Sequence, residues 1–159
     1  MHNPIMSKSL KRVRAALEAA GLETEIVETP LARTAADAAE AVGCAVDQIA
    51  KSIIFADASG AAVLFLTAGG NRVDGDKAAA LAGGPLSKAD AALIRAQTGF
   101  AIGGVSPVGH LNPIRAWMDP RLFEFDKIWA AAGTPHHVFA CDPREIERIC
   151  DAQVSDFTS

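Results

Sequence analysis

Residues 52–67 read SIIFADASGAAVLFLT, two apolar runs joined by a short polar turn. The first run covers residues 52–56 and the second covers residues 61–67, with Ser59 and Gly60 between them. Continuous apolar runs of this length, rich in β-branched and aromatic residues and separated by a glycine-containing turn, are typical of a β-hairpin buried on both faces. The stretch therefore predicts the centre of a sheet that other elements cover.

Helix and strand signals are intermixed on both sides of this hairpin. Side chains that commonly cap helix N-termini precede five expected helices, at Ser7, Thr34, Asp74, a Ser87–Asp90 capping box and Asp142. Further strands are expected at residues 23–28, 114–118, 128–131 and 137–140. Because hairpin neighbours alternate with longer crossovers, the pattern favours the α/β class in its mixed α+β form, with a mixed sheet flanked by helices.

The length and composition predict a globular chain with a single domain over residues 1–159. The chain has 159 residues, 50% of them hydrophobic and 21% charged, and it contains no internal repeat, low-complexity tract or long linker. No apolar run reaches the roughly 18 residues that span a bilayer, and no signal-peptide pattern precedes the first helix. We therefore expect a soluble cytoplasmic protein.

Charge and cysteine content exclude several classes of function. The net charge of −4 argues against DNA binding, which depends on many Lys and Arg contacts to phosphates. The three cysteines, at unrelated spacings, match neither a disulfide framework nor a zinc knuckle. The sequence also lacks HExxH, GxSxG, GxGxxG and P-loop motifs, so we expect no metal and no cofactor.

Lys51 stands at the start of the first apolar strand and admits two interpretations. A lysine at this position is commonly a surface residue whose stem covers apolar neighbours. Alternatively, an ammonium group at a strand end is a compact point charge that can hold a phosphate or a developing oxyanion. The sequence by itself leaves both open.

The segment FAIGGVSPVGH, residues 100–110, contains a GxxxP pattern formed by Gly103 and Pro107. Such a pattern occurs in ordinary tight turns. Adjacent glycines, here Gly103 and Gly104, also let a ligand approach backbone N–H groups without obstruction by a Cβ atom. Fixed N–H donors are what the tetrahedral intermediate of ester hydrolysis requires, which favours a binding loop.

Two adjacent histidines, His136 and His137, precede the strand expected at residues 137–140. Side chains alternate between the two faces of a strand, so both rings cannot ligate one metal ion without distortion. One of them can line a site. Taken alone, each is more often a structural residue.

Four segments together resemble the YbaK family, which comprises free-standing relatives of the editing domain inserted in bacterial prolyl-tRNA synthetase. They are AKSIIF at residues 50–55, RVDGDK at 72–77, TGFAIGGVSP at 98–107 and GTPHH at 133–137. The resemblance spans roughly residues 8–150, and the order and spacing of the segments make it specific although each is weak alone.

The resemblance implies a strongly curled mixed sheet or partial barrel surrounded by helices, and hydrolysis of an amino acid wrongly esterified to a transfer RNA. Lys51 matches the family's lysine at the 3′-terminal nucleotide, and the loop from Gly103 to Pro107 matches the family's GxxxP loop. We accordingly expect Lys51, Gly103 and Gly104 to be catalytic. Substrate binding is expected from Ser106, Pro107, Asp119, and His137 or His136.

The implied substrate is a small amino acid, such as alanine or cysteine, on transfer RNA for proline. Candidate walls of its pocket are Ile53, Phe65, Val105 and Met118. The implied partners are the aminoacyl-tRNA 3′ end and a prolyl-tRNA synthetase, with no membrane and no DNA. A non-catalytic module that binds transfer RNA or a synthetase is the alternative. The amino acid, the transfer RNA, the oligomeric state and the need for a synthetase stay open.

Overall fold

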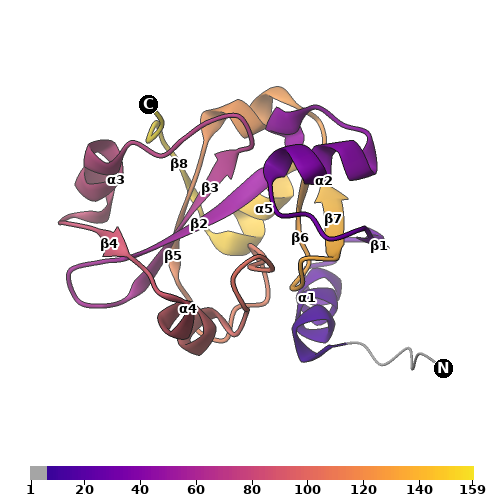
Figure 1. The fold of residues 1–159 in the computed structure, drawn as a ribbon, viewed down its shortest axis with the longest axis horizontal. Coiled ribbons are helices and arrows are strands. Elements are labelled where there is room, and N and C mark those ends of the chain that lie inside the picture. Colours follow the sequence, from indigo (N-terminus) through magenta and orange to yellow (C-terminus); the bar gives the residue numbers. More distant parts are fainter. Residues whose placement is uncertain (1–6) are drawn as a thin grey trace.

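The computed structural model describes residues 7–159, which form helices and strands in mixed order (Figure 1). The α-helices are α1 (Lys8–Ala19), α2 (Ala35–Val42), α3 (Gly75–Ala82), α4 (Ala91–Thr98) and α5 (Pro143–Cys150). Two short 3-10 helices are η1 (Val46–Gln48) and η2 (Pro120–Glu124). The strands are β1 (Ile26–Glu28), β2 (Ala50–Ala56), β3 (Ala62–Ala68), β4 (Ser87–Lys88), β5 (Arg115–Met118), β6 (Ile128–Ala131), β7 (His137–Cys141) and β8 (Gln153–Val154).

Each of these α-helices begins at a residue whose side-chain oxygen accepts a backbone N–H of the first turn. These N-cap residues are Ser7, Thr34, Asp74, Asp90 and Asp142. Such caps satisfy N–H groups that have no partner inside the helix. The starts predicted from the sequence are therefore confirmed, with one correction. Ser87 does not form a capping box with Asp90, because Ser87 lies in β4 and pairs with Ala56 of β2.

The strands form two sheets. The larger has the order β4-β2-β3-β5-β8 and is mixed, because β3 pairs antiparallel with β2 and parallel with β5. The smaller is antiparallel with the order β1-β7-β6. A single parallel bridge between Ile49 and Trp129 connects the two sheets where β2 begins. The mixed α+β class is confirmed, and the strands form two linked sheets that do not close into a barrel.

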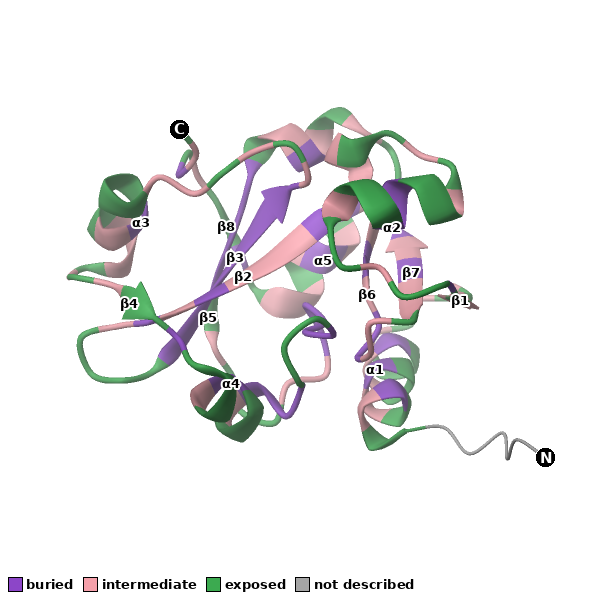
Figure 2. Ribbon diagram, viewed as in Figure 1, coloured by how far each residue is buried: buried purple, intermediate pink, exposed green. Residues whose placement is uncertain are grey.

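The β2–β3 hairpin lies at the centre of the molecule, as the apolar runs predict. Every residue of β3 is buried (Figure 2). Leu64 and Leu66 point into the main hydrophobic core, whereas Phe65 points into a second core on the opposite face, where it stacks on Trp117. Burial on both faces explains why β3 shows no alternation of polar and apolar residues.

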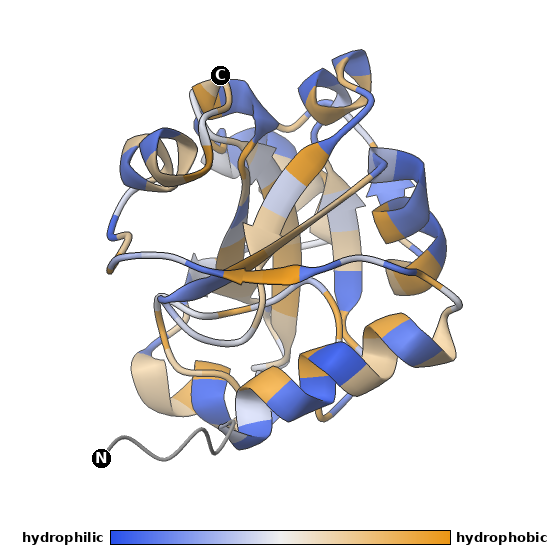
Figure 3. Ribbon diagram, turned by 90° about the vertical axis from the view of Figure 1, so that its right-hand side faces the viewer, coloured by the Kyte–Doolittle hydropathy of each residue, from blue (hydrophilic) through white to orange (hydrophobic). Residues whose placement is uncertain are grey.

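Helix α1 packs against the loops that follow α4 and β6. Polar and apolar bands alternate along it in Figure 3, and Leu10, Val13 and Leu17 are its buried residues. The Arg12 guanidinium donates to the carbonyl oxygens of Gly99 (2.8 Å) and Gly109 (3.1 Å). This helix therefore fixes both ends of the glycine-rich segment 100–110.

The segment 156–159 returns to the larger sheet and contacts the region after β3. Phe157 is fully buried against Phe65, and the Asp74 N–H donates to the Phe157 carbonyl (2.7 Å). The Ser159 N–H donates to the Arg72 carbonyl (3.1 Å). Sequence analysis predicts neither this contact nor β4, β8 and η2, which are too short to carry a periodic pattern. No helix in residues 7–159 is long and apolar enough to cross a membrane.

Candidate active site

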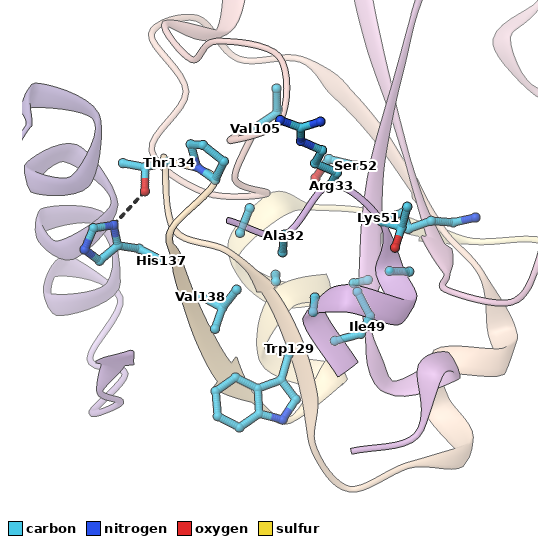
Figure 4. Close-up of a pocket in the computed structure, with 18 residues that line it drawn as sticks. Ala32, Arg33, Ile49, Lys51, Ser52, Val105, Trp129, Thr134, His137 and Val138 are labelled. Atoms are coloured by element: carbon cyan, nitrogen blue, oxygen red, sulfur yellow. Dashed lines mark hydrogen bonds between the residues drawn. The ribbon is translucent and has the colours of Figure 1, made fainter. Parts of the chain in front are cut away.

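A pocket of about 270 Å³ lies where the two sheets approach each other (Figure 4). Segments distant in the sequence line it: the start of β2, residues 32–35 and 38, Gly103 and Val105, residues 129–131 of β6, and residues 134, 135, 137 and 138. The first turn of α2 and the loop before it form one side, and the Gly103 and Thr134 loops form the other. The pocket therefore brings the GxxxP segment and the GTPHH segment to one place.

The GxxxP segment enters the pocket wall through a tight turn at residues 101–104. The Gly104 N–H donates to the Ala101 carbonyl (3.0 Å), and Gly103 has a φ of +91°, a conformation that favours glycine. Gly103 and Val105 line the pocket. Their N–H groups donate to no acceptor within residues 7–159.

Gly104 has a different role from Gly103. Gly104 is buried, does not line the pocket and has its N–H bonded within the turn. A Cβ atom at this position would lie 2.7 Å from the Thr134 Cα atom. The second glycine thus permits the two loops to pack together, and the expectation that its amide faces the substrate is corrected.

The opposite loop carries the two adjacent histidines, and in Figure 4 the His137 ring lies beside Thr134 on the side that faces α1. His137 lines the pocket, and its Nδ1 atom lies 2.6 Å from the Thr134 hydroxyl. His136 is exposed outside the pocket, and its N–H donates to the same hydroxyl (3.1 Å). Of the two, His137 belongs to the pocket lining, and its part in substrate binding stays a prediction.

Lys51 lines the pocket beside Ser52, and its side chain extends away from Thr134 and His137 in Figure 4. Its ammonium group donates to the Asn71 carbonyl (2.6 Å). The Asn71 side-chain amide in turn donates to Asp119 Oδ2 (2.9 Å). The lysine head group is thus held at the edge of the pocket by the loop that follows β3.

The charges around Lys51 act on its pKa in opposite directions. Partial burial lowers the pKa of Lys51, and the neighbouring Arg72 charge lowers it further. Asp119 and Asp47 oppose this shift by stabilising the ammonium form. The Lys51 ammonium is consequently easier to deprotonate than that of an isolated lysine.

The sequence model of the aminoacyl-tRNA editing domain family matches residues 29–149, which include every segment that lines this pocket. The chain belongs to this family. The resemblance to YbaK proteins predicted from the four sequence segments is thereby confirmed.

Solved structures and a curated protein are similar to this editing domain over nearly its whole length. One structure, of a protein proposed as a trans-editing enzyme for prolyl tRNA synthetase, is 46% identical with a TM-score of 0.91 and coverage of 98% of this chain and 99% of that one. A second, from work on epitope backbone grafting onto scaffold proteins, is 45% identical with a TM-score of 0.90 and coverage of 97% and 99%. The uncharacterized protein YwhH of Bacillus subtilis (strain 168) is 27% identical over 147 residues, 92% of this chain and 94% of that protein.

Three of the expected substrate-binding residues lie outside the pocket of the editing domain. Ser106 is fully buried, and its hydroxyl accepts the Val108 N–H (3.2 Å). Pro107 lines a different hollow, where its carbonyl accepts from the Cys150 thiol (2.9 Å). Asp119 is 2% exposed. Besides accepting from Asn71, it accepts the Ala68 N–H (3.1 Å), so it positions the loop that holds Lys51.

Of the apolar residues expected as pocket walls, Val105 lines the pocket. The others, Ile53, Phe65 and Met118, pack in the hydrophobic cores. Sequence reasoning missed Arg33, Ser52, Trp129 and Thr134 as lining residues. Two signals could have indicated them: Ser52 is the polar residue within the first apolar run, and Thr134 belongs to the GTPHH segment.

Within residues 7–159, no group of three or more His, Cys, Asp or Glu side chains is arranged to hold a metal ion. Among the described residues, the pocket lining also includes no Asp or Glu, and its ionisable side chains are Arg33, Lys51 and His137. The pocket can therefore accept negative charge, either on a phosphate or on an oxyanion.

Proposed function

We propose that this editing domain hydrolyses the ester bond between a small amino acid and the 3′ end of a transfer RNA. The proposal rests on Gly103 and Val105, which line a pocket of about 270 Å³ and whose backbone N–H groups donate no hydrogen bond within residues 7–159. A site of this size suits an aminoacyl group and excludes a folded nucleic acid. Membership of the editing family supports the same chemistry.

In this mechanism a water molecule attacks the ester carbonyl carbon, and the carbonyl oxygen becomes an oxyanion. The Gly103 and Val105 N–H groups stabilise that oxyanion, because fixed donors in a partly dry site act most strongly where charge develops. The carbon–oxygen bond to the ribose then breaks, and the ribose oxygen takes the proton that the water gives up. The products are the free amino acid and the transfer RNA.

Lys51 binds the phosphate of the terminal nucleotide in this proposal. Its ammonium has three N–H donors and gives one to Asn71, so two are available to a phosphate. The ribose 2′-hydroxyl of the substrate, or the thiol of a cysteinyl group, assists because it is already held at the reacting carbon. His137, oriented by Thr134, borders the aminoacyl group.

By analogy with the protein proposed as a trans-editing enzyme for prolyl tRNA synthetase, we propose transfer RNA for proline as the carrier and a prolyl-tRNA synthetase as the partner. A small amino acid such as alanine, cysteine or one of similar size is the group removed. An apolar pocket discriminates one methylene group by only about 1 to 3 kcal/mol, so size alone gives limited selectivity.

A panel of mischarged transfer RNAs tests this function. The purified protein is incubated with transfer RNA for proline carrying alanine, cysteine, serine or proline, and the release of free amino acid is compared with a protein-free control. Release faster than spontaneous hydrolysis supports the deacylase. Binding without release would instead identify the alternative, a non-catalytic module that binds transfer RNA or a synthetase.

A further inference from the structure

One hydroxyl group in the wall of the candidate pocket has no hydrogen-bond partner. Among the described residues, four buried side-chain polar atoms lack a partner: Thr29 Oγ1, Ser52 Oγ, His110 Nδ1 and Trp117 Nε1. Ser52 is the one of these residues that lines the candidate pocket (Figure 4). A buried hydroxyl without a partner destabilises the fold, so its presence at a ligand site calls for an explanation.

The position of Ser52 on β2 puts it on the strand face that borders the apolar end of the pocket, and its Oγ atom is closed to solvent. Side chains alternate along a strand, and the neighbours of Ser52 on the same face, Ala50 and Ile54, belong to the main hydrophobic core. Val105 and Ala130 belong to that core and also line the pocket. The Lys51 ammonium, in contrast, extends to Asn71.

A substrate in this pocket must enter with its amino acid first, because the attached RNA is far larger than the cavity and stays outside. The group that reaches the apolar end is therefore the amino acid side chain. The α-ammonium group is a poor occupant of this end, because the described pocket lining offers no carboxylate to balance its charge. An uncharged group that can form one hydrogen bond fits best.

We propose that the Ser52 hydroxyl binds the side-chain hydroxyl of the amino acid being removed, so that serine esters are preferred over alanine esters. This inference rests on the proposed deacylase function and specifies its substrate class as amino acids with a small hydroxylated side chain. A serine side chain pairs with Ser52, whereas an alanine side chain leaves the Ser52 hydroxyl unpaired. Sites built to bind a hydroxyl group discriminate in this way more strongly than apolar pockets do.

The experiment compares seryl- and alanyl-esters on the same transfer RNA, which differ by one oxygen atom. Each kcat/KM value is divided by the spontaneous hydrolysis rate of the same ester, because the two esters differ in intrinsic reactivity. We expect a serine-to-alanine ratio of about 10 for the unchanged protein, the effect of one neutral hydrogen bond. In the Ser52→Ala protein the ratio should fall to about 1, through loss of serine activity with alanine activity retained.

Two further variants separate binding from folding. Ser52→Cys keeps nearly the same side-chain volume with a weaker hydrogen-bonding group, so the ratio should lie between those of the unchanged protein and Ser52→Ala. Thr67→Val is the matched control on the adjacent strand β3, because the Thr67 hydroxyl is buried but already donates to the Phe65 carbonyl (3.0 Å). Thr67→Val should keep the serine-to-alanine ratio of the unchanged protein, whether or not its free energy of unfolding changes.

The thermal unfolding temperature distinguishes a substrate-binding serine from a structural one, because loss of a structural serine would lower it. Ser52→Ala should unfold at the same or a higher temperature than the unchanged protein, since it removes an unpaired buried hydroxyl. An equal loss of activity on both esters, an unchanged ratio, or a lower unfolding temperature with an unchanged ratio would overturn the assignment to the side-chain hydroxyl. Release of neither amino acid by the unchanged protein would instead contradict the proposed function itself.

Discussion

The segment 100–110 borders two hollows whose walls differ in chemistry. Its first half enters the candidate active site, where the Gly103 and Val105 amides and the Ser52 hydroxyl have no partner among residues 7–159. Its second half, residues 107–110, lines a hollow of about 480 Å³ on the other side, together with Ile149 and Cys150. One part of this loop therefore borders the candidate pocket, whereas the polar groups of the other part mostly form hydrogen bonds within the protein.

The second hollow favours uncharged groups. Burial raises the pKa of Cys150 to about 12, and its thiol donates to the Pro107 carbonyl. Burial also lowers the pKa of His110, whose ring contacts the Ser106 carbonyl. In the candidate pocket, by comparison, burial also lowers the pKa of Lys51, but two carboxylates, Asp119 and Asp47, oppose this shift. The comparison indicates that residues 106–110 anchor the loop, whereas Gly103 and Val105 border the candidate pocket.

Replacing Lys51 should produce the largest effect on activity. We expect Lys51→Ala to lower kcat/KM for deacylation by about 10-fold to 100-fold, the effect of losing a charge-assisted contact to the terminal phosphate. Folding should be little affected, because the ammonium lies at the pocket edge. The measurement is release of amino acid from mischarged transfer RNA.

Lys8→Ala is the matched control for this variant, since Lys8 is exposed in the first turn of α1 and has no ion pair within residues 7–159. It should keep wild-type kcat/KM. Full activity in Lys51→Ala would remove Lys51 from the mechanism.

The two adjacent glycines should respond differently to the same substitution. Gly104→Ala places a Cβ atom 2.7 Å from the Thr134 Cα atom, and backbone cannot move aside cheaply, so we expect a loss of about 3 kcal/mol in the free energy of unfolding. Gly103→Ala has room, with Pro135 Cβ at 3.9 Å, and should cost about 1 kcal/mol for its positive φ. Denaturant unfolding of both variants measures the difference, and equal losses would contradict the distinction.

The pH dependence of activity should reflect the charges around Lys51. If the ammonium form is required, activity is present below the pKa of Lys51 and is lost as the pH rises through it. Asp47→Asn removes a charge that raises this pKa, so the alkaline loss of activity should move to lower pH. Arg72→Gln removes a charge that lowers the pKa, so the loss should move to higher pH. Shifts in the same direction for both variants would exclude Lys51 as the titrating group.

The second hollow should affect stability in acid, and its effect should be the smallest of these. The pKa of His110 is lowered by burial, so protonation favours the unfolded chain, and stability is lost as the pH falls below the unfolded value of about 6.5. The free energy of unfolding should therefore fall as the pH is lowered from 7 to 5. His110→Gln should flatten this dependence in pH-dependent denaturant titrations. An identical slope in both proteins would assign the effect to other groups.

The sequence predicts those parts of the molecule whose signals are local. The β2–β3 hairpin follows from its apolar runs, and α5 follows from Asp142 and Pro143 at its start. The pairing of GxxxP with GTPHH in one pocket came from the family resemblance. The GxxxP motif leads to the prediction that Ser106 and Pro107 bind substrate, but membership of a motif does not show which side of a loop a residue faces. That side is decided by α1 and α5, which are distant in the sequence.

The contact of residues 156–159 with the region after β3 has a practical consequence for protein preparations. These residues hold Arg72 through the Ser159 N–H and cover Phe65 with Phe157, next to the loop whose Asn71 carbonyl receives the Lys51 ammonium. A protease that trims the tail would leave the central strands intact yet loosen the support of that lysine. Samples that lack residues 156–159 should then look well folded by circular dichroism while turning over substrate poorly, so the mass of the protein should be measured before any kinetic comparison.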